Sequence, residues 1–547
     1  MNDPAAHPES TLAPFRIHTF RDLWIASMVS NFGGLVQGVG AAWLMTSLSR
    51  SADMVALVQA STTLPIMVFS LMSGAVADGY DRRRVMLAAQ GFMFVVSVAL
   101  AACAFAGVIT PWLLLTFTFL IGCGVAFHNP AWQASVGDIV PREQIPSAVL
   151  LNGMGFNVVR TVGPAVGGII VAAAGAASAF VVNAVSYVGL IGVIRRWNYR
   201  KPPSTLPREP LVSAMTAGVR YVGQSPHILR VLLRGFAFGA TTIVILALLP
   251  LVARNQIGGT ALVFGVLLGA FGVGAVAGAF ASPRLRGIMS NETLVRWAFL
   301  GFALCALVTG LSTSAWVTAL ALVIGGAAWV MALSLFNTSV QISSPRWVVG
   351  RAMSLYQMSI FGGMALGSWI WGTVAEQTSL PTALLAAAVS MVLGGAIGLR
   401  VPLPGRRTMN LDPVNRWQEP ATALRIRPSS GPVAVFVEYD IDPAHVGKFM
   451  RLMQQRRRIR RRDGAVSWTL FRDVERPTVW IEQFEIPTWV DYVRFHQRTT
   501  HEDAGVGDLI RTLHRGEGPP RVRRLLIRDP AHSQVDPLIQ EPADLHA

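Results

Sequence analysis

The sequence predicts an all-α membrane protein of twelve transmembrane helices, followed by a small soluble α+β domain. Three observations support this: long apolar runs, arginines at every second joint between them, and a change of pattern near residue 430. A bilayer core about 30 Å thick needs roughly 20 mostly apolar residues per helical span. Lipid offers no hydrogen-bond partners, so such spans must be helices. The expected spans are approximately 23–48, 54–77, 85–108, 111–136, 148–174, 178–195, 228–252, 259–282, 293–312, 315–341, 350–374 and 380–399.

Composition agrees with this prediction. The 547 residues are 52% hydrophobic and 14% charged, with a mean hydropathy of +0.47, which a water-soluble chain of this length would not show. The net charge of +16 raises the question of nucleic acid. Residues 431–547 hold 18 Lys+Arg against 17 Asp+Glu, which leaves 28 against 13 in residues 1–430. The positive excess therefore belongs to the membrane part, and no nucleic-acid partner is expected.

The distribution of arginine predicts the orientation, because short loops rich in Lys and Arg stay in the cytoplasm. Alternate joints carry Arg82, Arg83 and Arg84, then Arg142, then Arg195, Arg196, Arg200, Lys201 and Arg208, then Arg284 and Arg286, then Arg346. The opposite joints carry only Arg50 and Arg254. We expect a multi-pass protein of the cell (inner or plasma) membrane with both termini in the cytoplasm. No motif indicates a metal or an organic cofactor.

The longest internal joint, residues 195–226, divides the spans six and six. Pro202, Pro203, Pro207 and Pro210 within it predict an extended tether. The expected organisation has seven parts: a cytoplasmic N-terminal segment (1–19), a first six-helix half (20–197), a cytoplasmic linker (198–226), a second six-helix half (227–400), a linker (401–430), a cytoplasmic ferredoxin-like domain (431–530) and a disordered tail (531–547).

An internal repeat supports duplicated halves. Asn129 and Gln133 stand four residues apart, as do Asn337 and Gln341, and a proline follows each pair. Two related halves around a site at the bilayer midplane are how many secondary transporters alternate access. With only two lysines in the chain and no G-x-x-x-x-G-K-[ST] loop, ATP-driven pumping by this polypeptide alone is excluded.

The joint between the second and third spans reads Gly74-Ala-Val-Ala-Asp78-Gly79-Tyr-Asp81-Arg82-Arg83-Arg84. This closely resembles the signature of the major facilitator superfamily, in which a glycine is followed by an aspartate and a basic pair. We interpret Gly74, Asp78, Arg82 and Arg83 as a conformational latch between the halves. Arginines here could instead merely obey the positive-inside rule. Asp81 departs from the signature, which has glycine before the basic pair.

Further motifs narrow the resemblance. The segments Phe20-Arg21-Asp22-Leu23-Trp24, Thr63-Leu64-Pro65 and Val140-Pro141-Arg142 resemble the transmembrane secretion effector group, whose members commonly carry a cytoplasmic tail domain. The resemblance implies export of a small molecule, such as a siderophore, drug or secondary metabolite, coupled to protons. It implies no enzymatic activity. The alternative is a membrane-anchored sensor or a monooxygenase-like tail enzyme, with the bundle as a ligand receptor.

Arg160 is the only charged residue that we expect deep in a span, and a buried guanidinium is costly unless it faces water, a partner or the bundle interior. It is our first candidate for the substrate or coupling pathway. The surrounding stretch resembles the fifth-span motif of antiporters in the superfamily. Its Gly163, Pro164, Gly167 and Gly168 predict either a hinge or a plain helix contact.

Uncharged amides form the second candidate set. They hold an oxygen-rich ligand or simply join helices. The expected pathway amides are Asn31, Gln37, Asn129, Gln133, Asn337, Gln341 and Gln357. No carboxylate lies at the midplane, so a boundary carboxylate or His128 carries the proton, or transport is not proton-driven.

After residue 430 the pattern predicts the order β-α-β-β-α-β of a ferredoxin-like module. Expected strands are 433–439, 465–472, 478–486 and 521–527, and expected helices are 443–462, 489–499 and 506–514. The module is similar to dimeric α/β-barrel proteins, which implies a regulatory role or dimerisation through this domain. The arginine run 456–462 predicts either contact with anionic lipid or a solvated helix face.

Overall fold

The computed structural model describes residues 12–198, 211–345, 347–403, 410–414, 417–424 and 426–528. The expected disordered tail 531–547, most of the N-terminal segment and the prolines of the first linker lie outside these residues. The chain forms two compact units. The first comprises Met1–Met215, Arg230–Val340 and Met353–Gly405, and the second Thr216–Leu229, Gln341–Ala352 and Arg406–Ala547.

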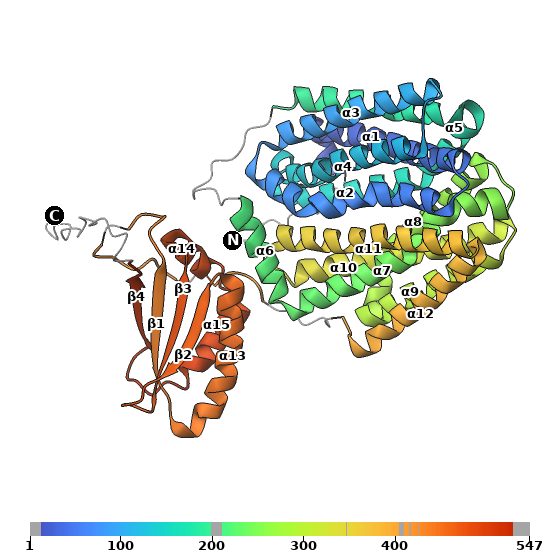
Figure 1. Cartoon of the computed structure of the whole chain (residues 1–547). Coiled ribbons are helices and arrows are strands. Elements are labelled where there is room, and N and C mark those ends of the chain that lie inside the picture. The colour runs from blue at the N-terminus through green and yellow to red at the C-terminus, as the bar shows by residue number, and fades with distance from the viewer. Residues whose placement is uncertain are drawn as a thin grey trace, which may run out of the picture. The chain divides into compact units, whose positions relative to one another are not determined.

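Each expected span corresponds to a helical segment (Figure 1). The helices are α1 (His18–Leu48), α2 (Ala52–Gly79), α3 (Arg82–Phe105), α4 (Pro111–Ile139), α5 (Ile145–Arg196), α7 (Pro226–Leu251), α8 (Ala261–Ile288), α9 (Asn291–Leu311), α10 (Ala315–Ile342), α11 (Val349–Gln377) and α12 (Leu380–Arg400). Among the described residues, nine helices can cross a membrane by length and composition, and α5 counts once among them. Because α5 contains two expected spans, these nine helices account for ten of the twelve. The helices α1 and α11 correspond to the remaining two.

A single glycine divides α5. Gly175 has φ 78° and ψ 170°, a left-handed conformation that favours glycine over residues with a side chain. It falls between the spans expected at 148–174 and 178–195. The helix-rich membrane architecture predicted from the sequence is therefore confirmed, and the turn between its fifth and sixth spans is very short.

The first linker differs from the expected tether. Residues Leu211–Gly223 form the helix α6 instead of an extended segment. No proline lies between Pro210 and Pro226, so none interrupts helical hydrogen bonding within α6. Ala217, Tyr221 and Val222 are buried, which gives the helix an apolar face to pack. The extended-tether prediction is wrong for this half of the linker.

A buried hydrogen-bonded cluster ties together three helices of the first half. The Gln37 Oε1 atom of α1 accepts hydrogen bonds from Ser97 Oγ of α3 at 3.2 Å and from Asn183 Nδ2 of α5. The Asn183 amide also donates to Tyr187 Oη at 3.1 Å. Gln37, Ser97 and Asn183 are at most 5% exposed. Buried amides that satisfy one another in this way fix helix orientation.

A second buried cation corrects the expectation that Arg160 is alone. Arg234 of α7 is 2% exposed and lies 3.3 Å from Glu292 Oε1 of α9. Arg296 lies 3.0 Å from the same oxygen, and the Leu403 N–H donates to the other carboxylate oxygen at 2.9 Å. Arg234 is close to the start of the expected span 228–252, and packing against α9 and the residues after α12 buries it.

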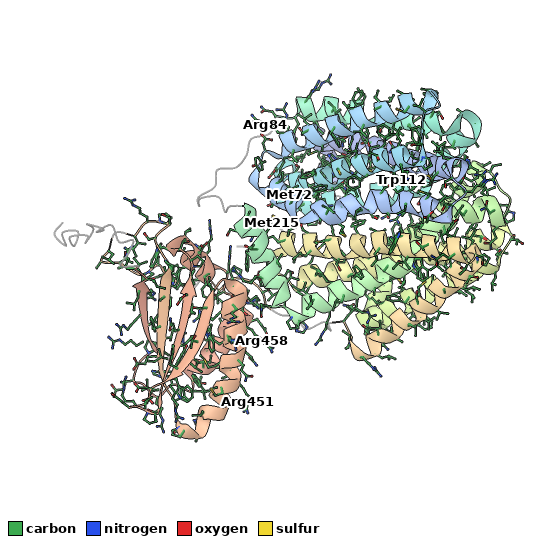
Figure 2. All side chains as sticks on the ribbon, in the orientation of Figure 1. Met72, Arg84, Trp112, Met215, Arg451 and Arg458 are labelled. Atoms are coloured by element: carbon green, nitrogen blue, oxygen red, sulfur yellow. The ribbon has the colours of Figure 1, made fainter. Side chains whose placement is uncertain are left out.

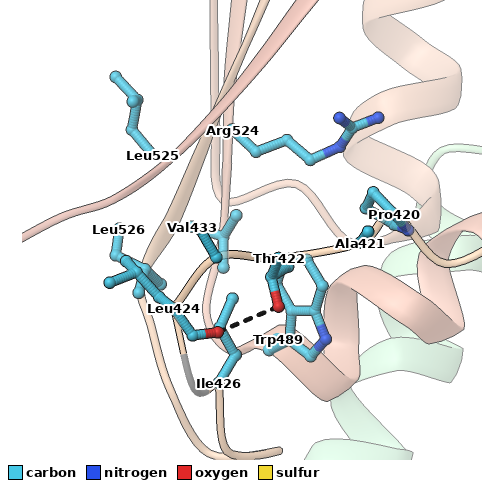
Figure 3. A pocket seen from close by; sticks show the side chains of 11 residues that line it. Pro420, Ala421, Thr422, Leu424, Ile426, Val433, Trp489, Arg524, Leu525 and Leu526 are labelled. Carbon is cyan, nitrogen blue, oxygen red and sulfur yellow. Dashed lines mark hydrogen bonds between the residues drawn. The ribbon is translucent and has the colours of Figure 1, made fainter. Parts of the chain in front are cut away.

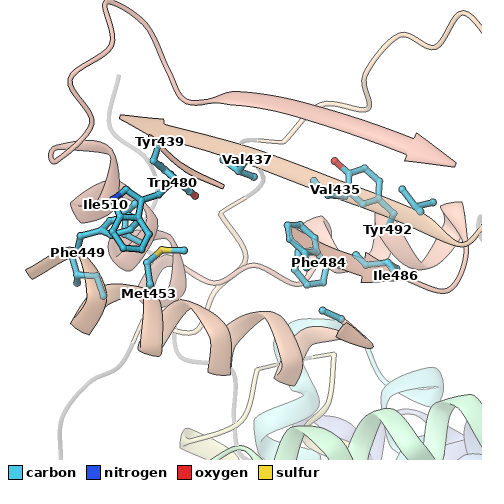
Figure 4. Close-up of a cluster of buried hydrophobic side chains, with 14 of the residues drawn as sticks. Val435, Val437, Tyr439, Phe449, Met453, Trp480, Phe484, Ile486, Tyr492 and Ile510 are labelled. Atoms are coloured by element: carbon cyan, nitrogen blue, oxygen red, sulfur yellow. The ribbon is translucent and has the colours of Figure 1, made fainter. Parts of the chain in front are cut away.

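The tail has the predicted ferredoxin-like order (Figure 1). Its antiparallel sheet has the strand order β2-β3-β1-β4. The elements are β1 (Val433–Asp440), α13 (Val446–Asp463), β2 (Ser467–Arg472), β3 (Val479–Ile486), α14 (Trp489–Gln497), α15 (His501–Arg511) and β4 (Arg521–Leu526). Alternate residues of β1, namely Val435, Val437 and Tyr439, point into one apolar core with Phe449 and Met453 of α13 (Figure 4).

The arginine run of α13 divides between two faces. Arg458 is exposed on the helix surface, as is Arg451 ahead of the run (Figure 2), whereas Arg460 is 7% exposed. Arg462 binds Asp503 of α15 at 2.6 Å and lies 4.9 Å above the Tyr221 ring within the same compact unit. Only part of the run is therefore available to lipid or solvent.

Candidate functional site

A cavity of about 420 Å³ lies inside the helical unit. Most of its wall comes from α1 to α5 of the first half. Leu246, Ala247 and Pro250 of α7 and Phe361 and Met364 of α11 close it from the second half. Its wall is mainly apolar, with a few convergent polar groups, which is the usual composition of a small-molecule site.

Three polar atoms in this wall lack a hydrogen-bond partner among the described residues. They are Ser27 Oγ, Gln90 Oε1 and His128 Nδ1. The three residues are 3%, 1% and 7% exposed. A buried polar group without a partner costs about 1–3 kcal/mol. A ligand or water that supplies complementary donors and acceptors would recover this energy, so the three atoms mark where a polar ligand group would bind.

Three of the expected pathway amides line the cavity, namely Asn31, Gln37 and Asn129. Within the described residues, the other pathway candidates are not part of its wall: Arg160, Gln133, Asn337, Gln341 and Gln357. Gln133 and Gln341, which are equivalent in the repeat, are both exposed. The function of these other residues stays a prediction.

Sequence reasoning missed Gln90. It is the single amide in the apolar run 85–108, and this isolated polar residue could have pointed to the third span as part of the wall. Tyr187 and Ser27 also line the cavity. A serine or tyrosine in an apolar span is too common to identify a site without knowing which helix face points inward.

Arg160 lies at the interface between the halves. Its guanidinium carbon is 5.7 Å from the centre of the Phe271 ring on α8. Next to it, a Cβ atom on Gly272 would stand 2.6 Å from the Thr161 Cα atom and 2.8 Å from the Arg160 carbonyl oxygen. The helices α5 and α8 thus approach backbone to backbone where Arg160 is placed.

The glycines of the fifth span serve two neighbouring helices. A Cβ on Gly163 would stand 3.1 Å from Leu35, and one on Gly167 the same distance from Val36, both on α1. A Cβ on Gly168 would stand 2.9 Å from the Gly265 Cα atom of α8. Pro164 lies inside α5, whose one non-helical residue is Gly175. The geometry favours close helix contact here, and a hinge stays a prediction.

The basic pair of the candidate latch binds within the first half. Arg82 Nη1 donates to Asp138 Oδ2 at 2.6 Å and to the Ala134 carbonyl oxygen at 2.8 Å, at the end of α4. Arg83 donates to the carbonyl oxygens of Ile194 and Arg195 at 3.0 and 2.6 Å, at the end of α5. Cations at helix C-termini are stabilised by the exposed carbonyls and the helix dipole.

The contact between halves at this joint comes from small residues. A Cβ on Gly74 of α2 would stand 2.7 Å from Ser354 Oγ of α11. Ser70 Oγ donates to the Ser354 carbonyl oxygen at 2.8 Å. The side chain of Asp78 lies outside the described part of the structure. A latch that includes Asp78 stays a prediction.

Comparison with known proteins agrees with this geometry. The model of a family described as transmembrane secretion effector matches residues 9–531. The enterobactin exporter EntS of Escherichia coli O1:K1 is 25% identical over 72% of this chain and 94% of its own length. The multidrug efflux pump Tap of Mycolicibacterium fortuitum is 24% identical over 69% and 94%. The staphyloferrin A transporter of Staphylococcus aureus is 22% identical over 48% and 66%.

Solved structures share the fold of the helical part. A bacterial homologue of the lysosomal transporter Spinster has a TM-score of 0.53 at 17% identity, covering 71% of this chain and 95% of its own. The peptide-family transporter PepTSo has a TM-score of 0.59 at 14% identity, covering 70% and 97%. At these identities the likeness concerns the arrangement of helices alone.

Proposed function

Because this chain belongs to the transmembrane secretion effector family of major facilitator transporters, we propose that it exports a small organic molecule of the siderophore, drug or secondary-metabolite class. The proposed mechanism is alternating access between its two six-helix halves. The observation that carries the proposal is the bundle cavity, in which the unpaired atoms of Ser27, Gln90 and His128 face a mostly apolar wall.

The family establishes a multi-pass membrane transporter and not an enzyme. The names of EntS and Tap support the export direction and the substrate class proposed here. A sensor or a tail enzyme is not favoured by any of these likenesses. Cytoplasmic termini, which rest on the distribution of arginine, and dimerisation through the tail are retained as parts of the proposal.

The cavity supports a largely uncharged substrate surface. Within the described residues its wall contains no Lys, Arg, Asp or Glu side chain. Recognition would therefore come from hydrogen bonds to amide, hydroxyl and imidazole groups and from apolar contact. The cavity volume of about 420 Å³ lies in the range of small-molecule sites.

Replacing Gln90 by leucine tests the substrate site. We expect Gln90→Leu to lower transport of iron-free enterobactin or of the dye Hoechst 33342 into inverted vesicles about fivefold to tenfold, because a substrate hydrogen bond is worth about 1–1.5 kcal/mol. The matched control is Gln377→Leu, the same change at an exposed position outside the wall. Equal rates for both variants and the unaltered protein, at equal expression, would contradict the proposed site.

Proton coupling is proposed to involve His128, the one histidine in the cavity wall. The carboxylates Asp22, Asp53, Asp138 and Glu376 are absent from that wall, although all four are described. We expect His128→Gln to abolish stimulation of transport by an imposed pH gradient while leaving downhill flux of the same dye. Stimulation that persists in this variant would assign coupling to another group.

A further inference from the structure

A second cavity lies within the tail domain, on the helix-covered side of its sheet. It has a volume of about 490 Å³. Strands β1 and β4 form one wall, α13, α14 and α15 form the opposite wall, and Trp417 of the preceding linker closes one side. All of these residues belong to one compact unit. Neither the family match nor the transport proposal assigns a role to this cavity.

The cavity is positively charged. Among the described residues, its lining includes four arginines, Arg456, Arg460, Arg511 and Arg524, but only one carboxylate, Asp508. Asp508 pairs with Arg511 at 3.4 Å. The buried Glu482 beside the cavity adds one further negative charge. Four cations thus face two anions, and the surplus favours an anionic ligand.

Glu482 is committed to other partners. It lies 3.0 Å from Arg460 Nε and accepts hydrogen bonds at 3.0 Å from Tyr439 Oη and from Trp468 Nε1. Arg456 Nε lies 3.8 Å from the same carboxylate, which is beyond hydrogen-bond distance. The Nε atom is buried and has no hydrogen-bond partner among the described residues. Arg456 therefore presents a charge and a donor that the domain does not fully satisfy.

The wall also has flat aromatic surfaces. The rings of Trp417 and His496 are stacked, with centroids 4.8 Å apart and an interplanar angle of 3°. Tyr492 meets His496 edge-on at 4.7 Å. His496 Nε2 is buried without a partner. Burial and the nearby arginines lower the pKa of His496 to about 3, so the ring is neutral at physiological pH.

Arg524 joins this cavity to a neighbouring hollow. Its Nε donates to Tyr492 Oη at 2.7 Å. Its side chain also lines a second hollow of about 320 Å³, together with Thr422, Leu424 and Trp489 (Figure 3). The guanidinium is therefore placed between an apolar surface and the aromatic wall.

We propose that the tail domain binds a small organic anion with a flat apolar body, of the aromatic carboxylate class, in the cavity between its sheet and its helices. The anionic group binds at Arg456 and the body contacts the aromatic wall. Arginine suits this role because its planar fork matches a carboxylate in geometry. The site is separate from the bundle cavity, and the inference does not depend on the direction of transport.

Calorimetric titration of the full-length protein in detergent tests the proposal, with 2-naphthoate as the probe and 2-naphthamide as its uncharged isostere. We expect saturable binding of 2-naphthoate and at least tenfold weaker binding of 2-naphthamide. Arg456→Met should weaken 2-naphthoate binding at least tenfold. The matched control is Arg458→Met, the same change on the exposed face of α13, which should bind as the unaltered protein does.

A second variant guards against misfolding of the first. Ala504→Leu places a larger side chain in the cavity wall without removing a charge, and it should also weaken 2-naphthoate binding at least tenfold. Absence of saturable binding, equal binding of the two probes, or equal losses in Arg456→Met and Arg458→Met would overturn the proposal. So would binding that survives Arg456→Met but disappears in Gln90→Leu, because it would place the anion in the bundle.

Discussion

Leucine in place of Gly265 is expected to lower transport strongly without preventing membrane insertion. A Cβ on Gly265 would stand 2.7 Å from the Gly168 Cα atom and 2.7 Å from the Pro164 carbonyl oxygen. Neither backbone atom can move without displacing α5 or α8. Overpacking of this kind costs about 1–3 kcal/mol. Each 1.4 kcal/mol lowers the population of the state in which α5 and α8 are in contact about tenfold.

The effect should be graded and specific. Gly265→Ala should reduce dye transport into inverted vesicles less than Gly265→Leu, which we expect to lower it about tenfold to a hundredfold. The control is Gly189→Leu, since a Cβ on Gly189 has no heavy atom within 4 Å. All three variants should elute as unaggregated protein in detergent. If Gly265→Leu transports normally, the close approach of α5 and α8 has no part in the transport cycle.

Removal of the Glu482 carboxylate is expected to unfold the tail domain or leave it barely stable. Glu482 is fully buried and balances Arg460 and Arg456 from one position. Glu482→Gln leaves those guanidinium groups without a negative partner, which costs about 3–5 kcal/mol. The control is Glu485→Gln on the same strand, where the side chain is partly exposed and a change within about 0.5 kcal/mol is expected.

The same carboxylate makes the tail sensitive to acid. The arginines and hydrogen-bond donors around it outweigh its burial and lower the pKa of Glu482 to about 2 from its ordinary 4.5. A lowered carboxyl pKa stabilises the fold above pH 4.5 and loses that contribution as the pH falls toward 2. The loss amounts to about 3 kcal/mol.

Two other groups act in a higher pH window and oppose each other. The lowered pKa of His496, about 3, removes stability as the pH falls below 6.5. Burial raises the pKa of Asp463 to about 6, so stability increases as the pH falls from 6 toward 3.8. The steep loss should therefore begin near pH 4.5. Urea unfolding of 5-fluorotryptophan-labelled protein, followed by fluorine NMR, would show this step, and its persistence in Glu482→Gln would contradict the assignment.

Helices and strands that follow from the periodicity of apolar residues were predicted from the sequence. Apolar length identified each membrane helix, and alternation in 433–439 identified β1 with its core face. The break at Gly175 lies between the spans expected at 148–174 and 178–195. These features depend on local pattern, because a span or a strand must satisfy its own backbone and bury its own face.

The site was less predictable, since it depends on which way each helix is turned. Asn129 lines the cavity but Gln133, one turn further along α4, does not. Gln90 has the same chemistry as the other amides and was not singled out. Arg234 was not considered from the sequence, and its partner Glu292 comes from α9, a different helix. In each case, the position of the side chain is determined by contacts with residues distant in the sequence. A local sequence pattern does not contain these contacts.

The cluster around Gln37 has a mechanical consequence. Its buried hydrogen bonds join α1, α3 and the segment of α5 after Gly175. If these helices slid past one another, the bonds would break, and lipid offers no replacement partners. The first half is thereby stiffened against shear. The first half should therefore move as a rigid body, so that a displacement at one end of its helices also displaces the other end.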